Sequence, residues 1–261
     1  MNCCLIITTY NWPEALILVL SSALSQSILP DEIIVADDGS GESTRKALAE
    51  FPNTTLTPII HSWQKDDGFQ LAKSRNRAIA LARYEYIIVV DGDMILHKDF
   101  IRDHKRVAKK GIYIQGSRAL LQKDFSKSIL VNNCFKKPSL FSNEAKNKIN
   151  LFRIPLLSML FSFFKYQNIN RIRGCNFSLF KEDIIKVNGF DEDFVTWGKE
   201  DSEFVQRLFN NGIFRKNLKL AGLQYHLYHP EGLSNINNID LLKKTITRKV
   251  KKCVNGINKY I

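Results

Sequence analysis

The feature that most constrains the fold is an apolar run from Tyr86 to Val90 that ends abruptly on Asp91 and Asp93. A continuous β-branched run is typical of a strand that is buried on both faces. Open α/β sheets bind their ligands beyond the carboxyl ends of such strands. Two aspartates separated only by Gly92 repel each other, which favours a site where a divalent cation or a sugar hydroxyl lies between them. The alternative is a solvated loop whose aspartates cap the next helix.

Strands and helices alternate along the first hundred residues, which predicts a mostly parallel sheet with crossover helices. Strands are expected at 3–9, 32–36, 56–61 and 86–90, and helices at about 13–23, 42–50 and 72–83. Polar groups follow the first two strands, as Thr8-Thr9-Tyr10-Asn11 and Asp37-Asp38-Gly39-Ser40. The second group is also what an N-cap and turn need without any ligand.

The expected third helix carries a candidate donor ligand. Asp66 or Asp67 can cap this helix, and Arg75 has the planar donor fork that suits a nucleotide diphosphate or a ribose. Taken alone, Arg75 and Arg77 also fit the description of solvated helix charges.

Length and cysteine content indicate one large intracellular unit. The 261 residues suit a single α/β core with a small C-terminal extension. Five cysteines without metal-ligand spacing indicate neither a disulfide framework nor a structural zinc, so a reducing, cytosolic setting fits. The first ten residues enter a strand pattern without a basic leader, so no signal peptide is expected.

The net charge of +12 is confined to two segments. Residues 135–173 carry eight Lys and Arg against one acid, residues 241–261 carry seven against none, and the remainder is close to neutral. A nucleic-acid reader would usually spread a basic face over its fold, so this pattern favours an enzyme that docks on an anionic surface.

Both basic segments contain apolar stretches. Residues 149–164 are too short to span a bilayer, and they are either an ordinary buried helix or an interfacial helix on an anionic membrane. In residues 241–261 the apolar positions recur every three or four residues, at Leu242, Ile246, Val250, Val254 and Ile257. This spacing predicts one basic amphipathic helix that packs on the core or lies on the membrane.

The ordered set of motifs resembles a family 2 glycosyltransferase with the GT-A fold. In the N-terminal half the resemblance rests on residues 8–11, 37–40, 64–76 and 91–93. Residues 173–178, 188–192 and 197–201 are similar to the C-terminal half shared by β-1,4-galactosyltransferases and bacterial chondroitin-synthase-like enzymes. The resemblance implies a GT-A domain over 1–240, with a nucleotide-sugar-binding half (1–100), an acceptor-binding half (101–240) and an apolar insertion (135–170).

The resemblance also implies roles for particular residues. Asp93 would coordinate Mn²⁺ or Mg²⁺, and Asp91 would contact the ribose or the metal. The implied donor site is Thr8, Tyr10, Asp38, Arg75, Asp91, Gly92, Asp93 and His229, with the nucleoside held by Thr8, Tyr10 and Asp38. His226 is the expected further metal ligand, which would bias the site toward manganese. A zinc site is the alternative for His226 and His229, but no neighbouring cluster completes a tetrahedron.

A general base is expected at the start of a helix near residue 200. Asp201 lies four residues before Val205, so it begins the inward face of that helix, and a helix N-terminus favours an ionised carboxylate. A simple first-turn acid is the alternative. By resemblance, Asp201 is the base, Glu200 supports acceptor binding and Trp197 offers a flat wall for a sugar ring.

The resemblance implies an inverting, metal-dependent hexosyltransferase that uses a UDP-sugar. Its acceptor would be a growing bacterial surface glycan, such as lipopolysaccharide core or capsule, at the inner face of the cytoplasmic membrane. A nucleotidyltransferase acting on a sugar phosphate is a second hypothesis, against which the Trp-Gly-x-Glu-Asp segment and the lack of a Gly-rich phosphate loop count. A non-catalytic membrane or nucleic-acid module is favoured by net charge alone, and no nucleic-acid partner is expected.

Overall fold

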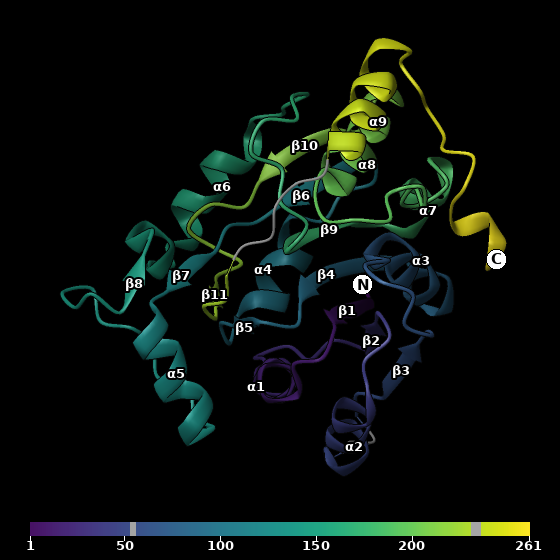
Figure 1. Ribbon diagram of the computed structural model, residues 1–261. Helices are drawn as coiled ribbons and strands as arrows, with labels where there is room; N and C mark the ends of the chain where they lie inside the picture. Colours follow the sequence, from purple (N-terminus) through teal and green to yellow (C-terminus); the bar gives the residue numbers. More distant parts are fainter. Residues whose placement is uncertain (53–55, 231–235) are drawn as a thin grey trace.

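The computed structural model describes residues 1–52, 56–230 and 236–261, and it has two β-sheets with helices packed around them (Figure 1). The larger sheet has the strand order β10-β6-β9-β4-β1-β2-β3. Its strands are β1 (Cys3–Thr9), β2 (Glu32–Asp37), β3 (Ile59–Trp63), β4 (Tyr86–Asp91), β6 (Ile112–Gln115), β9 (Asn176–Phe180) and β10 (Phe214–Asn217). Only β9 runs antiparallel to its neighbours, so the sheet is mostly parallel, as predicted.

A smaller sheet has the order β5-β11-β7-β8. It consists of β5 (Met94–Leu96), β7 (Ala119–Leu121), β8 (Ala145–Lys146) and β11 (Gln224–His226). The helices are α1 (Pro13–Leu24), α2 (Glu42–Glu50), α3 (Leu71–Leu81), α4 (Phe100–Val107), α5 (Lys123–Asn132), α6 (Pro155–Phe163), α7 (Lys181–Lys186), α8 (Glu200–Asn210) and α9 (Ile236–Thr247), with short 3₁₀ turns η1 (Lys148–Leu151) and η2 (Ile257–Lys259).

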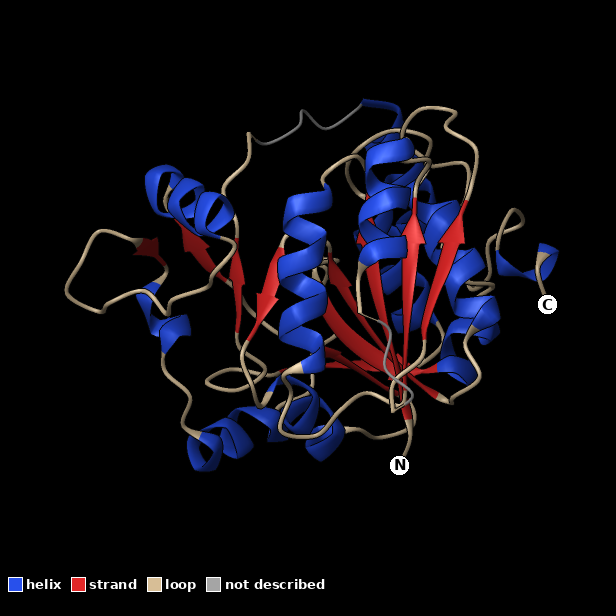
Figure 2. Cartoon of the chain, turned by 90° about the horizontal axis from the view of Figure 1, so that it is seen from below, coloured by secondary structure: helices blue, strands red, loops and turns tan. Residues whose placement is uncertain are grey.

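Helices cover both faces of the larger sheet (Figure 2). Because successive side chains of a strand point to opposite faces, β1 places Leu5 and Ile7 in the core with α1 and α4, and Ile6 in the core with α3 and α8. Every residue of β1 is buried, which explains its unbroken apolar sequence.

Two expected boundaries shift in the structure. The third strand was predicted at 56–61 but lies at Ile59–Trp63, because it pairs with β2 up to the point where β2 ends. The expected capping of α3 by Asp66 or Asp67 is wrong, since the N-cap is Gln70 and has no side-chain cap hydrogen bond. Asp66 instead accepts a hydrogen bond from the Tyr10 hydroxyl.

The prediction of one continuous helix over 241–261 is also wrong, because α9 ends at Thr247. The side-chain amides of Asn210 and Asn211 donate hydrogen bonds to the carbonyls of Val250 and Lys251, in place of the backbone amides that a continuing helix would use. Ile257 is then buried in the core beside α3, whereas Val254 is 93% exposed. The end of the tail therefore packs on the core, which is one of the two arrangements expected for it.

The apolar stretch 149–164 is not an ordinary buried helix. It forms η1 and the nine-residue α6, and Ser158 is the only residue of α6 that is buried. In the part of the chain that the structure describes, no helix is long and apolar enough to cross a membrane.

Candidate active site

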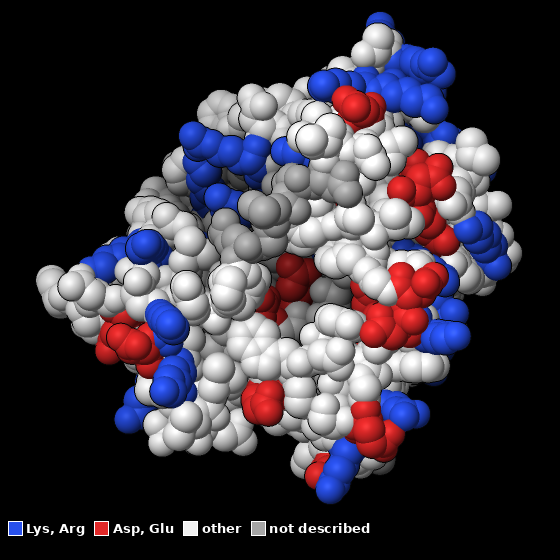
Figure 3. Space-filling model, viewed as in Figure 1, with Lys and Arg blue, Asp and Glu red and all other residues white. Residues whose placement is uncertain are grey.

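The polar strand ends predicted to meet do so at the carboxyl edge of β1, β2 and β4. The parallel register places Thr8 beside Asp91 and Thr9 beside Asp37. The Thr8 hydroxyl donates to Asp91 Oδ1 at 2.9 Å. A pocket of about 680 Å³ opens at this edge, and acidic side chains are visible within the central hollow of the surface (Figure 3).

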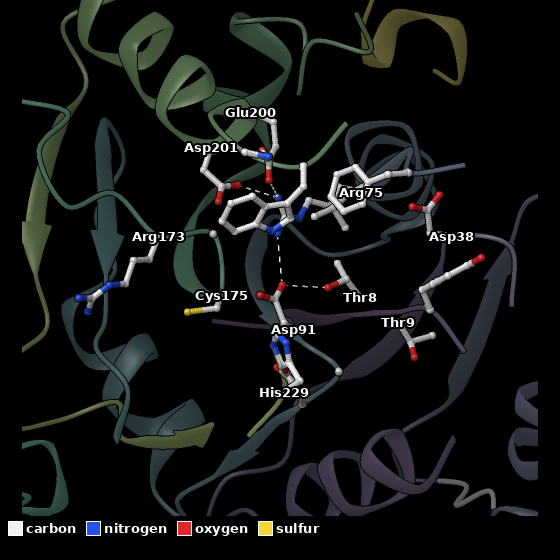
Figure 4. Close-up of a pocket in the computed structure, with 18 of the residues that line it drawn as sticks. Thr8, Thr9, Asp38, Arg75, Asp91, Arg173, Cys175, Glu200, Asp201 and His229 are labelled. Atoms are coloured by element: carbon white, nitrogen blue, oxygen red, sulfur yellow. Dashed lines mark hydrogen bonds and ion pairs between the residues drawn. The ribbon is translucent and has the colours of Figure 1, made fainter. Parts of the chain in front are cut away.

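All residues predicted for the site line this pocket. They are Thr8, Tyr10, Asp38, Arg75, Asp91, Gly92, Asp93, Trp197, Glu200, Asp201, His226 and His229. Residues from the first and last thirds of the chain thus share one cavity (Figure 4). Their individual roles stay predictions.

Arg75 links the two sides of the pocket. Its guanidinium is 1% exposed and lies 2.7 Å from Asp201 Oδ1 and 3.3 Å from Asp91 Oδ1, as drawn in Figure 4. Glu200 is the third carboxylate within reach, at 3.9 Å. Burial alone would lower the pKa of Arg75, but Asp201, Asp91 and Glu200 outweigh it and raise that pKa. The charged partners of Arg75 in this structure are therefore carboxylates, and a contact with the donor stays a prediction.

Asp201 lies in the first turn of α8 and keeps a 22% exposed side chain. Gly174, in the loop before β9, makes room for it. A Cβ at position 174 would come within 2.2 Å of Asp201 Oδ1, so a larger residue there would displace the carboxylate. The Arg-Gly-Cys-Asn segment thus needs glycine at position 174 to leave room for the candidate base.

Glu200 is buried beside Asp201 and accepts a hydrogen bond from the Gly198 amide at 3.1 Å. Burial, together with the charge of Asp201, raises the pKa of Glu200 to about 8. At neutral pH Glu200 is then mostly protonated, which leaves Asp201 as the candidate proton acceptor of the pair.

We expect Glu200→Gln to stabilise the protein at alkaline pH. Because the folded pKa of Glu200 lies above its ordinary value of 4.5, the native state holds a proton that the unfolded state has lost, and stability falls as pH rises toward 8. Gln mimics the protonated acid, so the melting temperature of the variant should exceed that of wild type clearly at pH 9 and by much less at pH 5. Equal melting temperatures at both pH values would contradict the assigned protonation state.

Asp93, His226 and His229 converge on one point, and their ligand atoms lie within 4.8 Å of one another. Antiparallel pairing of β11 with β5 places His226 opposite Met94 and thus beside Asp93. Asp93 Oδ2 lies 3.1 Å from His226 Nε2 and 3.0 Å from His229 Nε2. The buried Oδ1 of Asp93 has no hydrogen-bond partner among the described residues.

One carboxylate and two imidazoles fit a divalent cation that keeps positions open for substrate oxygens. Burial alone would raise the pKa of Asp93, but hydrogen bonds with His226 and His229 outweigh burial and lower it. The hydrogen bond with Asp93 raises the pKa of His229. His229, expected near the phosphates, therefore joins the candidate ligands. Asp91 lies outside this group, and its Oδ1 accepts from Thr8 and Arg75.

Asp38 and Tyr10, which are predicted to hold the nucleoside, both line the pocket. Asp38 accepts hydrogen bonds from Gln64 Nε2 at 2.6 Å and from the Gln70 amide at 2.9 Å, and burial raises the pKa of Asp38 to about 6. Tyr10 is half exposed. Gly92 is tightly packed, because a Cβ there would lie 2.5 Å from the carbonyl oxygen of Thr8.

Sequence reasoning missed Arg118, which lines the pocket from the β6–β7 loop. The loop is fixed by Asn176, whose amide donates to the Ser117 carbonyl at 2.9 Å, and by Asn150, whose amide donates to the Arg118 carbonyl at 2.7 Å. The sequence around Arg118 carries no motif, so no signal marked it. Trp12, Arg173, Cys175 and Lys199 also line the pocket without an assigned role.

Comparison with known proteins places this chain in a family. The profile described as glycosyl transferase family 2 matches residues 4–174, which is more than half of the chain. The chain belongs to this family. A second profile, described as the N-terminal domain of galactosyltransferase, matches residues 156–230. This family member therefore matches profiles over both of the regions whose motifs carry the resemblance.

Similar proteins include two bacterial polysaccharide synthases. The chain is 30% identical to a chondroitin synthase of Escherichia coli over 88% of its length, and 31% identical to a hyaluronan synthase of Pasteurella multocida over 88%. It spans 35% of the first protein and 25% of the second. The chain thus corresponds to about a third or less of these relatives.

A solved structure of S. aureus TarS residues 1–349 in complex with UDP superposes with a TM-score of 0.64 at 16% identity. The match covers 100% of this chain and 68% of that one. At this identity the likeness concerns the fold, and the predicted GT-A fold is confirmed.

Proposed function

We propose that this protein is an inverting, metal-dependent glycosyltransferase that moves a hexose from a UDP-sugar to a growing bacterial surface glycan. One observation carries the proposal: Arg75 joins Asp91, at the end of β4, to Asp201, at the start of α8, inside a single pocket. Arg75 thereby holds Asp91, on the proposed donor side, and Asp201, the proposed base on the acceptor side, across one cavity. The names of the relatives, two of them synthases of polysaccharides, support a glycan acceptor.

The proposed reaction is a direct displacement at the anomeric carbon. Asp201 accepts the proton of the acceptor hydroxyl, whose oxygen attacks that carbon while the bond to the diphosphate oxygen breaks on the opposite side. The Asp201 carboxylate lies in the first turn of α8, and the ion pair with Arg75 holds it at the pocket. Trp197, 43% exposed at the pocket wall, offers a flat apolar surface for the acceptor sugar.

The donor would lie along the edge formed by Thr8, Tyr10, Asp38 and Asp91. Asp93, His226 and His229 would hold Mn²⁺ or Mg²⁺, which would neutralise charge on the leaving diphosphate. We further propose that the enzyme works at the inner face of the cytoplasmic membrane, where lipopolysaccharide core or capsule is extended.

A panel of nucleotide sugars tests this function. We expect one UDP-sugar to be consumed in the presence of Mn²⁺ or Mg²⁺, and no consumption with EDTA. Asp93→Ala should reduce consumption to the EDTA level, because it removes the carboxylate shared by both histidines. The measurement is release of UDP from each donor, with and without metal.

Asp240→Ala is the matched control, since Asp240 is an exposed carboxylate that forms an ion pair with the surface residue Lys243. This variant should keep wild-type consumption. If no nucleotide sugar is consumed and calorimetry detects no UDP binding, the acids at the strand ends are structural and the proposed activity is wrong.

A further inference from the structure

The most unusual surface of the molecule surrounds α6. Of its nine residues only Ser158 is buried, whereas Leu156 is 77% exposed and Phe163 is 72% exposed. We call this the α6 apolar surface, formed by Phe152, Ile154, Leu156, Leu157, Met159, Leu160, Phe161, Phe163 and Phe164, all of them exposed. Contiguous apolar surface of this kind marks an interaction site in a soluble fold.

The α6 apolar surface is presented by a fixed helix and not by a loose loop. Before the helix, the Ile154 amide donates to the Leu220 carbonyl at 2.8 Å, and Arg153 forms a bidentate ion pair with Asp103. After it, Tyr166 and Arg215 exchange two backbone hydrogen bonds. Both ends are therefore tied to the domain while the apolar side chains face outward.

A group of cations borders this surface. Arg106 contacts the sulfur of Met159, and the Lys219 ammonium lies 5.2 Å from the centre of the Phe161 ring. We call the α6 cation group Arg106, Lys109, Lys165, Lys216 and Lys219. Burial and the charges of Lys109 and Lys165 lower the pKa of Lys216, so these like charges lie near one another.

These cations are not neutralised by neighbouring acids. No member of the α6 cation group forms an ion pair within the described residues. The nearby carboxylates of Asp99 and Asp103 are paired with Arg153. An anionic partner would therefore meet free positive charge beside an apolar patch.

We propose that the α6 apolar surface and the α6 cation group dock the protein on an anionic lipid bilayer, with α6 lying in the interface. A nine-residue helix is about 14 Å long, too short to span a bilayer but sufficient to insert its apolar face among the acyl chains. The cations would face the lipid phosphates. A second copy of the chain fits less well, because a two-fold interface would bring the same cations face to face.

The position of this surface suits an acceptor held in the membrane. Lys and Arg gather over α6 and β10 on the same face of the molecule that shows the acid-lined hollow (Figure 3). A protein docked through α6 would keep its pocket close to the bilayer surface. The docking itself does not depend on the reaction that the pocket performs.

Vesicle flotation tests the proposal. Wild-type protein should float with vesicles containing phosphatidylglycerol and bind pure phosphatidylcholine at least tenfold more weakly. The triple variant Leu156→Ser, Leu160→Ser, Phe163→Ser should lose on the order of 10²- to 10³-fold in partitioning, because three apolar side chains no longer insert. Lys165→Gln with Lys219→Gln should lose about 25-fold at low salt, about fivefold for each cation.

Val131→Ser with Val254→Ser is the matched control, since both side chains are highly exposed but lie outside α6. It should float like wild type, and all variants should keep the wild-type melting temperature. Failure of wild type to float, or equal flotation of the triple variant, would overturn the proposal. So would a wild-type dimer that the triple variant converts to monomer without any lipid binding. Flotation requires no turnover, so this result is separate from the test of the glycosyltransferase activity.

Discussion

Asp201→Asn should lower turnover by about 10²- to 10⁴-fold, which is the usual contribution of a general base. Asn has nearly the same shape as Asp, so it can still accept the hydrogen bond from Arg75 and pack against Gly174. It cannot take a proton from the acceptor hydroxyl. The affinity for UDP, measured by calorimetry, should therefore change less than about threefold, while the initial rate of sugar transfer falls by the factor given above.

Asp193→Asn is the control for this experiment. Asp193 is an exposed carboxylate in the loop before α8, and it is not among the residues that line the pocket. Its replacement should leave turnover unchanged. Wild-type turnover in Asp201→Asn would show that another group accepts the proton, whereas loss of UDP binding would show that Asp201 serves the donor side.

The ends of the buried strands could be predicted from the sequence because an apolar run followed by polar residues is a local pattern. The run from Tyr86 to Val90 is buried on both faces, so its apolar pattern and the following acids could be interpreted without knowledge of the fold. His226 could be placed near Asp93 only through the family resemblance, since 133 residues separate them and three-residue strands such as β5 and β11 carry no periodicity.

Other features depend on tertiary contacts that no local pattern encodes. Arg75 would be a solvated charge on an isolated helix, but α3 is packed against the sheet and opposite the start of α8, so the side chain becomes a buried bridge. The regular apolar spacing after Leu241 predicted a helix as far as residue 261, but α9 ends at Thr247, and the side chains of Asn210 and Asn211 bind the carbonyls of Val250 and Lys251 beyond that end. The sequence did not decide whether residues 149–164 form a buried or an interfacial helix, because apolar residues in a short helix are usually buried.

Arg75→Met should have the largest effect on stability. It removes the guanidinium that pairs with both Asp91 and Asp201, and loss of one partner from a buried ion pair costs about 3–5 kcal/mol. We expect a lower melting temperature in thermal unfolding and negligible transfer activity. Because protonation of the unpaired carboxylates relieves their repulsion, the stability lost by this variant should be smaller at pH 5 than at pH 8.

Arg75→Lys separates charge from geometry. Lysine restores one positive charge but lacks the fork whose two nitrogens reach Asp201 and Asp91 at the same time. Its stability should therefore lie between those of wild type and Arg75→Met, while transfer stays well below wild type because Asp201 is no longer held. Arg77→Met, two residues along α3 and hydrogen-bonded only weakly to the Trp63 carbonyl at 3.3 Å, should leave both properties unchanged. Full activity in Arg75→Lys would mean that the bridge between the two sides of the pocket contributes charge alone, and the positioning of Asp201 would then rest on α8 and Gly174.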